Sequence, residues 1–360
     1  MNPILSINET KCLQVLLALT APERSPLHCG GGSIVDVIKE FDGWDYLLGL
    51  LIRHKVAGVA FSRLVELQMC DCVPYRFFVT LKSIHSFWTH RTEYMLGEAV
   101  RVIDALNSHG VLAVPLKGTV LAEVVYRDYG CRFLNDIDVL VRSVDRKAVL
   151  NILHSEGFLE GNYSRDKHLV EPLSRSDQVL WGLKMFNMPP LIYMSDNLYE
   201  PSLHVDVAFG VSYKASESAV DLMLSRSYDY GVFKSLHPED FFLHICSHLH
   251  KEATNEAWGA VGQSENLIKY IDALNFYCAF DESLQGGRLT ERALELGLVV
   301  PLSHTVYALE LLYGNSIVSS VRESLVERKL SVEFDANIYR QGDSPVSRNV
   351  TPLIRQLVSL

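Results

Sequence analysis

The feature that most constrains the fold is a change in hydrophobic periodicity near residue 111. Over residues 34–109 apolar side chains recur every three or four positions, which is the spacing of amphipathic helices. Beyond residue 111 short apolar runs alternate with helix-length stretches, and the helical period returns from about residue 213 to residue 327. This order predicts an α+β fold in which a small mixed β-sheet core stands between large N- and C-terminal helical regions.

The core is expected to alternate strands and helices before further strands follow. The spacing predicts strands at residues 111–116, 137–141, 179–186, 191–194 and 203–209, and helices at 118–125 and 144–156, the last ending at Gly157. A later helix is expected to start at Pro238, with two acids in its first turn. We therefore divide the chain into a helical region at 1–110, the α/β core at 111–212, a second helical region at 213–333 and a loosely ordered tail at 334–360.

Charge and apolar content limit the partners of the chain. The formal charge of −10 is a poor match to a phosphate backbone, which disfavours nucleic acid as a general partner. Charged residues interrupt the longest apolar stretches, so no membrane span is expected. The amino terminus has no pattern of a secretion signal, and seven scattered cysteines suit reduced thiols. These observations together predict a cytoplasmic protein.

Two aspartates separated by one residue carry the clearest chemical signal. Asp136 and Asp138 stand at the start of the strand predicted at 137–141. The alternation of side chains turns both aspartates to one face, while Ile137 and Val139 point into the core. Carboxylates held side by side repel each other unless a cation lies between them, and hard oxygen ligands favour Mg²⁺ or Mn²⁺. Magnesium keeps waters and recruits substrate phosphates, so the natural ligand is a metal–nucleotide complex. A D-x-D pair also occurs by chance in surface strands and turns.

A third acid would complete a site for two metal ions. Asp206 is the candidate, because in the strand predicted at 203–209 the apolar residues take one face while His204, Asp206 and Ala208 take the other. If this strand lies beside the first, Asp206 meets the other two acids. The alternative for a single strand aspartate is a solvated side chain.

Basic residues that could hold phosphates precede the acid pair. Lys117-Gly118 follows a strand and opens a helix, where backbone N–H groups and the helix dipole favour an anion. Arg132 offers a planar donor fork four residues before Asp136. The alternative for Lys117 is an ordinary surface lysine, and the alternative for Arg132 is a structural ion pair.

These motifs resemble those of the nucleotidyltransferase superfamily of polymerase-β-like fold, and within it a branch of uncharacterised bacterial nucleotidyltransferase-like proteins. The resemblance covers about residues 34–310 and is carried by two blocks, Leu116-Lys117-Gly118 and Arg132-Phe133-Leu134-Asn135-Asp136-Ile137-Asp138-Val139-Leu140-Val141. The chain departs from the superfamily in two places. Lys117-Gly118-Thr119 replaces a glycine-serine turn, and Asp206-Val207-Ala208-Phe209 lacks the family's histidine after the acid.

The resemblance implies a role for each matching residue. Asp136, Asp138 and Asp206 would bind Mg²⁺ (or Mn²⁺) and be catalytic, with Asp206 helping to deprotonate the acceptor hydroxyl. The implied nucleotide-binding residues are Lys117, Gly118, Thr119 and Arg132. His204 and His248 are the implied residues on the acceptor side.

The expected activity is a Mg²⁺-dependent nucleotidyl transfer from an NTP to a hydroxyl of a small-molecule or peptide acceptor, with release of pyrophosphate. Two alternatives stay open. The altered motif on the third strand suits a non-catalytic descendant that binds a nucleotide or a partner. The second alternative is a toxin-like nucleotidyltransferase that acts on tRNA or protein. The negative net charge of the chain counts against tRNA as its substrate.

Overall fold

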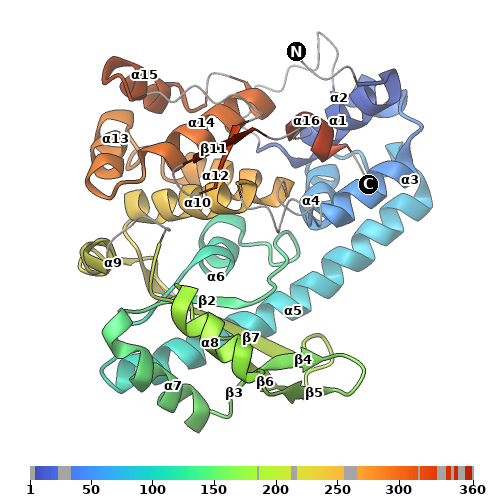
Figure 1. The fold of residues 1–360 in the computed structure, drawn as a ribbon. Coiled ribbons are helices and arrows are strands. Elements are labelled where there is room, and N and C mark those ends of the chain that lie inside the picture. The colour runs from blue at the N-terminus through green and yellow to red at the C-terminus, as the bar shows by residue number, and fades with distance from the viewer. Residues whose placement is uncertain are drawn as a thin grey trace. The chain divides into compact units, whose positions relative to one another are not determined.

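The computed structural model describes residues 5–22, 34–184, 186–211, 217–254, 266–314, 317–330, 338–341, 344–347 and 353–358. The chain forms two compact units. We call Met1–Ser86 with Phe242–Leu360 the helical unit, and Phe87–Phe241 the sheet unit. Helix α5, Tyr75–Ser108, begins in the first and continues into the second (Figure 1).

The helical unit is built from helices with one small hairpin. Its elements are α1 (Ile7–Thr20), α2 (Ile34–Lys39), α3 (Trp44–Arg53), α4 (Ala57–Glu66), η1 (Cys70–Cys72), most of α10 (Pro238–Ala253), α12 (Leu267–Ala279), α13 (Gly286–Glu295), α14 (Val299–Tyr313), α15 (Ser319–Glu327), β10 (Ile338–Gln341), β11 (Ser344–Ser347) and α16 (Leu353–Leu357). Local sequence starts the first helix, since the Ser6 hydroxyl accepts the Glu9 N–H at 3.2 Å and the Glu9 carboxylate accepts the Ser6 N–H at 2.7 Å.

The sheet unit contains a five-stranded mixed sheet in the order β1-β2-β7-β6-β3. Its strands are β1 (Val114–Pro115), β2 (Ile137–Leu140), β7 (Ser202–Ala208), β6 (Leu191–Met194) and β3 (Leu159–Glu160). Strands β2 and β7 pair in parallel, and the other neighbours are antiparallel. The predicted α+β fold with a small mixed sheet and helical regions is confirmed.

Further elements of the sheet unit flank the sheet. They are α6 (Lys117–Leu121), η2 (Ala122–Tyr126), η3 (Ser143–Asp145), α7 (Arg146–Ser155), β4 (Asn162–Ser164), β5 (Leu169–Glu171), α8 (Arg175–Lys184), α9 (Glu217–Leu224), β8 (Tyr228–Asp229) and β9 (Lys234–Ser235). The helix predicted to close at Gly157 is present as α7, and Gly157 has a positive φ of 89° as that ending requires.

Alternation on the central strands sorts the two faces of the sheet. Ile137, Val139 and Val207 are fully buried, and together with Val205 they form part of one core cluster with residues of α5 and α7. Burying each such side chain contributes about 1.5–3 kcal/mol, so the apolar face fixes the register of both strands. The opposite face carries Asp138, His204 and Asp206 together with the buried Leu140.

The strand predicted at residues 179–186 is wrong, because the chain forms helix α8 at Arg175–Lys184. Residues 179–186 form a nearly continuous apolar run, which is typical of a buried strand as well as of a helix, so the start of the segment determines the outcome. The Ser174 hydroxyl accepts the Asp177 N–H at 3.1 Å, which is the arrangement of a helix cap.

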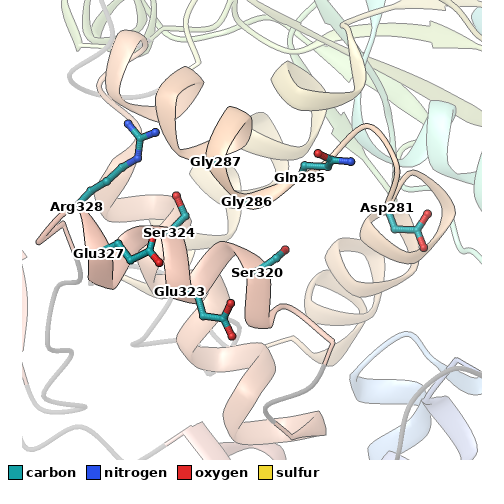
Figure 2. Close-up of a pocket in the computed structure, with 9 residues that line it drawn as sticks. All are labelled: Asp281, Gln285, Gly286, Gly287, Ser320, Glu323, Ser324, Glu327 and Arg328. Atoms are coloured by element: carbon teal, nitrogen blue, oxygen red, sulfur yellow. The ribbon is translucent and has the colours of Figure 1, made fainter.

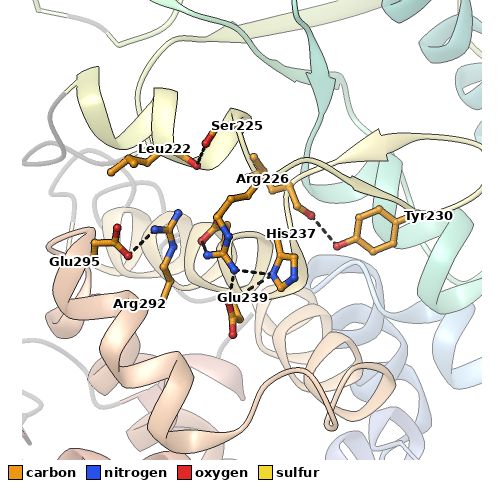
Figure 3. Close-up of polar contacts among 10 residues, drawn as sticks. Leu222, Ser225, Arg226, Tyr230, His237, Glu239, Arg292 and Glu295 are labelled. Carbon is orange, nitrogen blue, oxygen red and sulfur yellow. Dashed lines mark hydrogen bonds and ion pairs between the residues drawn. The ribbon is translucent and has the colours of Figure 1, made fainter.

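The region expected to be helical after residue 213 also contains a hairpin, β8–β9, before α10. Helix α10 begins at Pro238 as predicted. Arg226, in the segment after α9, donates to Glu239 at 2.7 Å and lies 3.3 Å from Nδ1 of His237 (Figure 3). The ion pair ties this segment to the first turn of α10.

One glycine in the helical unit is required by a close approach. A Cβ on Gly286 would stand 2.0 Å from the carbonyl oxygen of Ser320, so the start of α13 lies directly against the start of α15. A pocket of about 410 Å³ opens beside this contact, lined by Glu323, Glu327 and Arg328 among others (Figure 2). The residues singled out from the sequence do not line it.

None of the helices within the described ranges has both the length and the apolar character needed to cross a membrane. No disulfide bond forms among the described cysteines, which are Cys12, Cys70, Cys72, Cys131, Cys246 and Cys278, and Cys29 lies outside the described residues. The division of the chain into four parts stays a prediction. Of the tail at 334–360, the structure describes only β10, β11 and α16.

A buried histidine joins three segments of the helical unit. Nδ1 of His54 accepts the N–H of Leu267 at 3.3 Å, so Nε2 carries the proton and donates to the carbonyl oxygen of Leu357 at 3.0 Å. The side chain is only 1 % exposed, and burial lowers the pKa of His54 to about 4. The fold therefore requires the neutral imidazole.

We predict that the free energy of unfolding falls as the pH drops from about 6.5 toward 4. The unfolded chain takes up a proton near pH 6.5 while folded His54 does not, and the difference amounts to about 2–3 kcal/mol by pH 4.5. Burial also lowers the pKa of His250 to about 4 and that of His304 to about 3, and both act in the same direction.

Urea unfolding followed by circular dichroism at pH 7 and pH 4.5 measures the effect. His54→Gln should reduce the pH dependence by the contribution of His54, about 2–3 kcal/mol, whereas the same change at exposed His109 should keep it. Equal pH dependence in both variants would refute the assignment.

Candidate active site

Parallel pairing of β2 with β7 brings the three predicted acids together. Asp138 stands directly opposite Asp206 in the register, and Asp136 precedes β2. One carboxylate oxygen from each residue lies within 4.8 Å of those of the other two. The adjacency that the sequence left open is therefore present in the structure.

Burial makes this cluster electrostatically demanding. Asp138 is 6 % exposed, while Asp136 and Asp206 are partly exposed. Burial raises the pKa of Asp138, and the neighbouring carboxylates of Asp136 and Asp206 add to the rise, against the opposing effect of Lys117. The arrangement is one that a cation stabilises.

Lys117 supplies a positive charge inside the cluster. Its Nζ lies 2.5 Å from Oδ1 of Asp138. Burial acts to lower the pKa of Lys117, but attraction to Asp138, Asp206 and Asp136 outweighs it and the pKa of Lys117 is raised. The ammonium is therefore held in its charged form.

The backbone around Lys117 explains how its side chain reaches the sheet. Leu116 N–H donates to the carbonyl oxygen of Asp138 at 2.9 Å, which carries the β1–β2 pairing one residue further. Lys117 then takes a φ of 46°, in the left-handed region that disfavours side chains with a Cβ. This turn starts α6 beside the acids.

The side chain of Arg132 lies next to Gly118, which is in the first turn of α6. A Cβ on Gly118 would stand 2.7 Å from Cδ2 of Leu134 and 3.5 Å from Nη2 of Arg132. The glycine therefore permits the segment before β2 to approach α6. Thr119, by contrast, is 1 % exposed, and its buried hydroxyl has no hydrogen-bond partner within the described residues.

Asn187 belongs to the site although the sequence did not indicate it. Its Nδ2 donates to both carboxylate oxygens of Asp206, at 2.7 and 2.9 Å. An isolated bridge between Asn187 and Ala208 holds the asparagine beside β7. The pairing of Asn187 with Ala208 joins residues 21 positions apart, so it leaves no signal in the local sequence.

The two histidines assigned to the acceptor side lie in different units. His204 is on the same face of β7 as Asp206, two residues away. Burial lowers the pKa of His204, against the opposing attraction of Asp136. His248 is on the part of α10 that belongs to the helical unit, where its Nε2 lies 3.4 Å from Glu252.

The donor set fits a hard divalent cation. Two carboxylates from paired strands and that of Asp136, just before β2, offer oxygen ligands and negative charge, which Mg²⁺ and Mn²⁺ prefer over nitrogen or sulfur sites. The partial exposure of Asp136 and Asp206 leaves room for waters or phosphate oxygens beside the ion.

Comparison with family models matches residues 41–314 to a family described as an uncharacterised nucleotidyltransferase. The matched range contains the whole sheet unit and therefore all three acids. Searches of curated proteins and of solved structures find no match to the chain.

We predict that Lys117→Met lowers the free energy of unfolding by about 2 kcal/mol in EDTA, because it leaves the buried Asp138 carboxylate without its counter-charge. Adding Asp138→Asn should recover most of the loss. Urea unfolding of both variants at pH 8 measures the effect. An additive loss in the double variant would contradict this account of the pair.

Proposed function

Because the chain belongs to the family described as uncharacterised nucleotidyltransferases, we propose that it moves a nucleoside monophosphate from an NTP to a hydroxyl of a small-molecule or peptide acceptor. Pyrophosphate is the second product. The observation that carries the proposal is the clustering of Asp138 and Asp206, on paired parallel strands, with Asp136, which directly precedes β2.

Asp136, Asp138 and Asp206 would hold Mg²⁺, or Mn²⁺ in its place. When bound, the divalent ion supplies charge neutralisation for the triphosphate and for the developing negative charge of the transition state. The three acids act by fixing where that charge is placed. Their closeness is unfavourable without a cation, which is the expected signature of a site built for one.

Lys117 and Arg132 are proposed to contact the phosphates. Lys117 already lies at the edge of the acid cluster, and a rotation of its long side chain can exchange the carboxylate of Asp138 for a phosphate oxygen. Arg132 stands beside Gly118 at the start of α6, where its planar fork suits phosphate oxygens. Both residues would counter charge on the leaving pyrophosphate.

Asp206 is proposed to receive the proton of the acceptor hydroxyl. The hydroxyl oxygen forms a bond to the α-phosphorus, while the bond from that phosphorus to the bridging oxygen of the β-phosphate breaks in line. Asn187 holds the Asp206 side chain through both carboxylate oxygens. His204, on the same face, is proposed to lie on the acceptor side.

The proposal predicts metal-dependent turnover that requires the acid pair. Incubation with Mg²⁺ and each α-labelled NTP should release pyrophosphate and transfer label, and Asp136→Asn/Asp138→Asn should reduce the rate by at least about a hundredfold. Asp196→Asn, a change at an exposed acid of the same unit, should leave the rate unchanged.

The acceptor panel separates the proposal from its alternatives. Label on a small molecule or peptide supports it, and label on tRNA or on a larger protein favours the toxin-like activity. Tight NTP binding without turnover over the whole panel would contradict catalysis and favour a binding protein.

A further inference from the structure

One face of α5 contacts the segment that leads into β2. Trp88, Arg91 and Thr92 are spaced i, i+3, i+4 and therefore share that face. The Thr92 hydroxyl donates to the carbonyl oxygen of Arg132 at 3.1 Å, and the ring of Trp88 lies 5.3 Å from the ring of Phe133. The segment before Asp136 is thus held against a long helix.

Arg91 makes two contacts at once. Its guanidinium carbon lies 4.4 Å from the centre of the Phe133 ring, and its Nη2 forms an ion pair with Glu200. Arg91 and Glu200 are 7 % and 6 % exposed, so this pair is buried. Nη1 of Arg91 has no hydrogen-bond partner within the described residues, which leaves the ring of Phe133 as the contact on that side.

The two partners of Arg91 precede the two acid-bearing strands. Phe133 stands three residues before Asp136, and Glu200 stands two residues before the start of β7. A single guanidinium therefore joins the entry of one acid strand to the entry of the other. Burial lowers the pKa of Arg91, against the opposing attraction of Glu200 and of Asp136.

We propose that Arg91 is a positioning residue that sets the placement of Asp136 and Asp138 relative to Asp206. The proposal rests on the proposed function in so far as the acid cluster is a metal site. Arg91 acts through Phe133 and Glu200 and does not itself contact the metal or the nucleotide.

Arginine is the side chain that this role requires. A planar guanidinium stacks on an aromatic ring and pairs with a carboxylate at the same time, whereas a lysine ammonium keeps the charge without the planar stack. Arg91→Lys therefore removes the planar stack on Phe133 while it keeps the positive charge. It leaves Glu200 with a positive partner.

A matched control lies on the same helix. Arg101 forms ion pairs with Glu98 and Glu156 at 2.7 Å each, and its guanidinium carbon lies 5.2 Å from the ring centre of Tyr193. Its partners do not lead into β2 or β7. Arg101→Lys makes the same chemical change without touching the entries of the acid strands.

The first experiment measures Mn²⁺ affinity by electron paramagnetic resonance, together with NTP turnover as a function of Mn²⁺. Arg91→Lys should weaken Mn²⁺ binding at least about tenfold, and Arg101→Lys should not. Saturating Mn²⁺ should restore most of kcat in Arg91→Lys. A high Mn²⁺ concentration fills a site whose affinity is weakened, but it does not repair a damaged fold. Wild-type affinity and turnover in a folded Arg91→Lys protein would overturn the proposal.

A second variant covers the case in which Arg91→Lys does not fold. Arg91→Gln/Glu200→Gln removes both buried charges together, which avoids leaving one of them unpaired. It should fold and show the same loss of Mn²⁺ affinity. Retained affinity in this variant would likewise overturn the role of Arg91.

Hydrogen exchange separates failure of this inference from failure of the proposed function. If the wild type binds no Mn²⁺ and shows no turnover, the proposed function fails. The positioning role is then decided by amide exchange in peptides covering residues 131–141 and 200–208. Faster exchange in Arg91→Lys than in Arg101→Lys supports it, and equal exchange rejects it.

Discussion

Parallel pairing of β2 with β7 is the constraint on which the candidate site depends. Because the side-chain period of a strand is two residues, a slip of one residue would turn Asp206 into the core and Val207 toward the acids. The buried Val205 and Val207 of β7 oppose such a slip, since each would lose its apolar environment. The hydrophobic core and the acid cluster are thus two consequences of one register.

Much of the fold and part of the site follow from local sequence. The D-x-D pair, the alternation around Asp206 and the helix start at Pro238 are visible because each depends on near neighbours. The segment ending at Lys184 is predicted wrongly as a strand, because the apolar run at residues 179–186 indicates a buried strand as readily as a helix. The helix cap at Ser174 lies outside that run.

The remaining features depend on contacts between distant parts of the chain. Asn187 reaches Asp206 from a bridge to β7, and Arg91 reaches Glu200 from a helix more than a hundred residues earlier. Neither residue lies in a recognisable motif, and asparagine and arginine are ordinary at surfaces. Only the packed sheet reveals that both have partners around the acids.

The left-handed backbone of Lys117 has a consequence for any attempt to make this protein more heat-resistant. A glycine would relax that turn, whereas lysine adopts it at a cost of about 1 kcal/mol. Loss of the ion pair with Asp138 costs more than this relief, about 2 kcal/mol, so selection for thermal tolerance alone would keep the ammonium group. The residue at position 117 is therefore a poor target for stabilising substitutions, even though its backbone is strained.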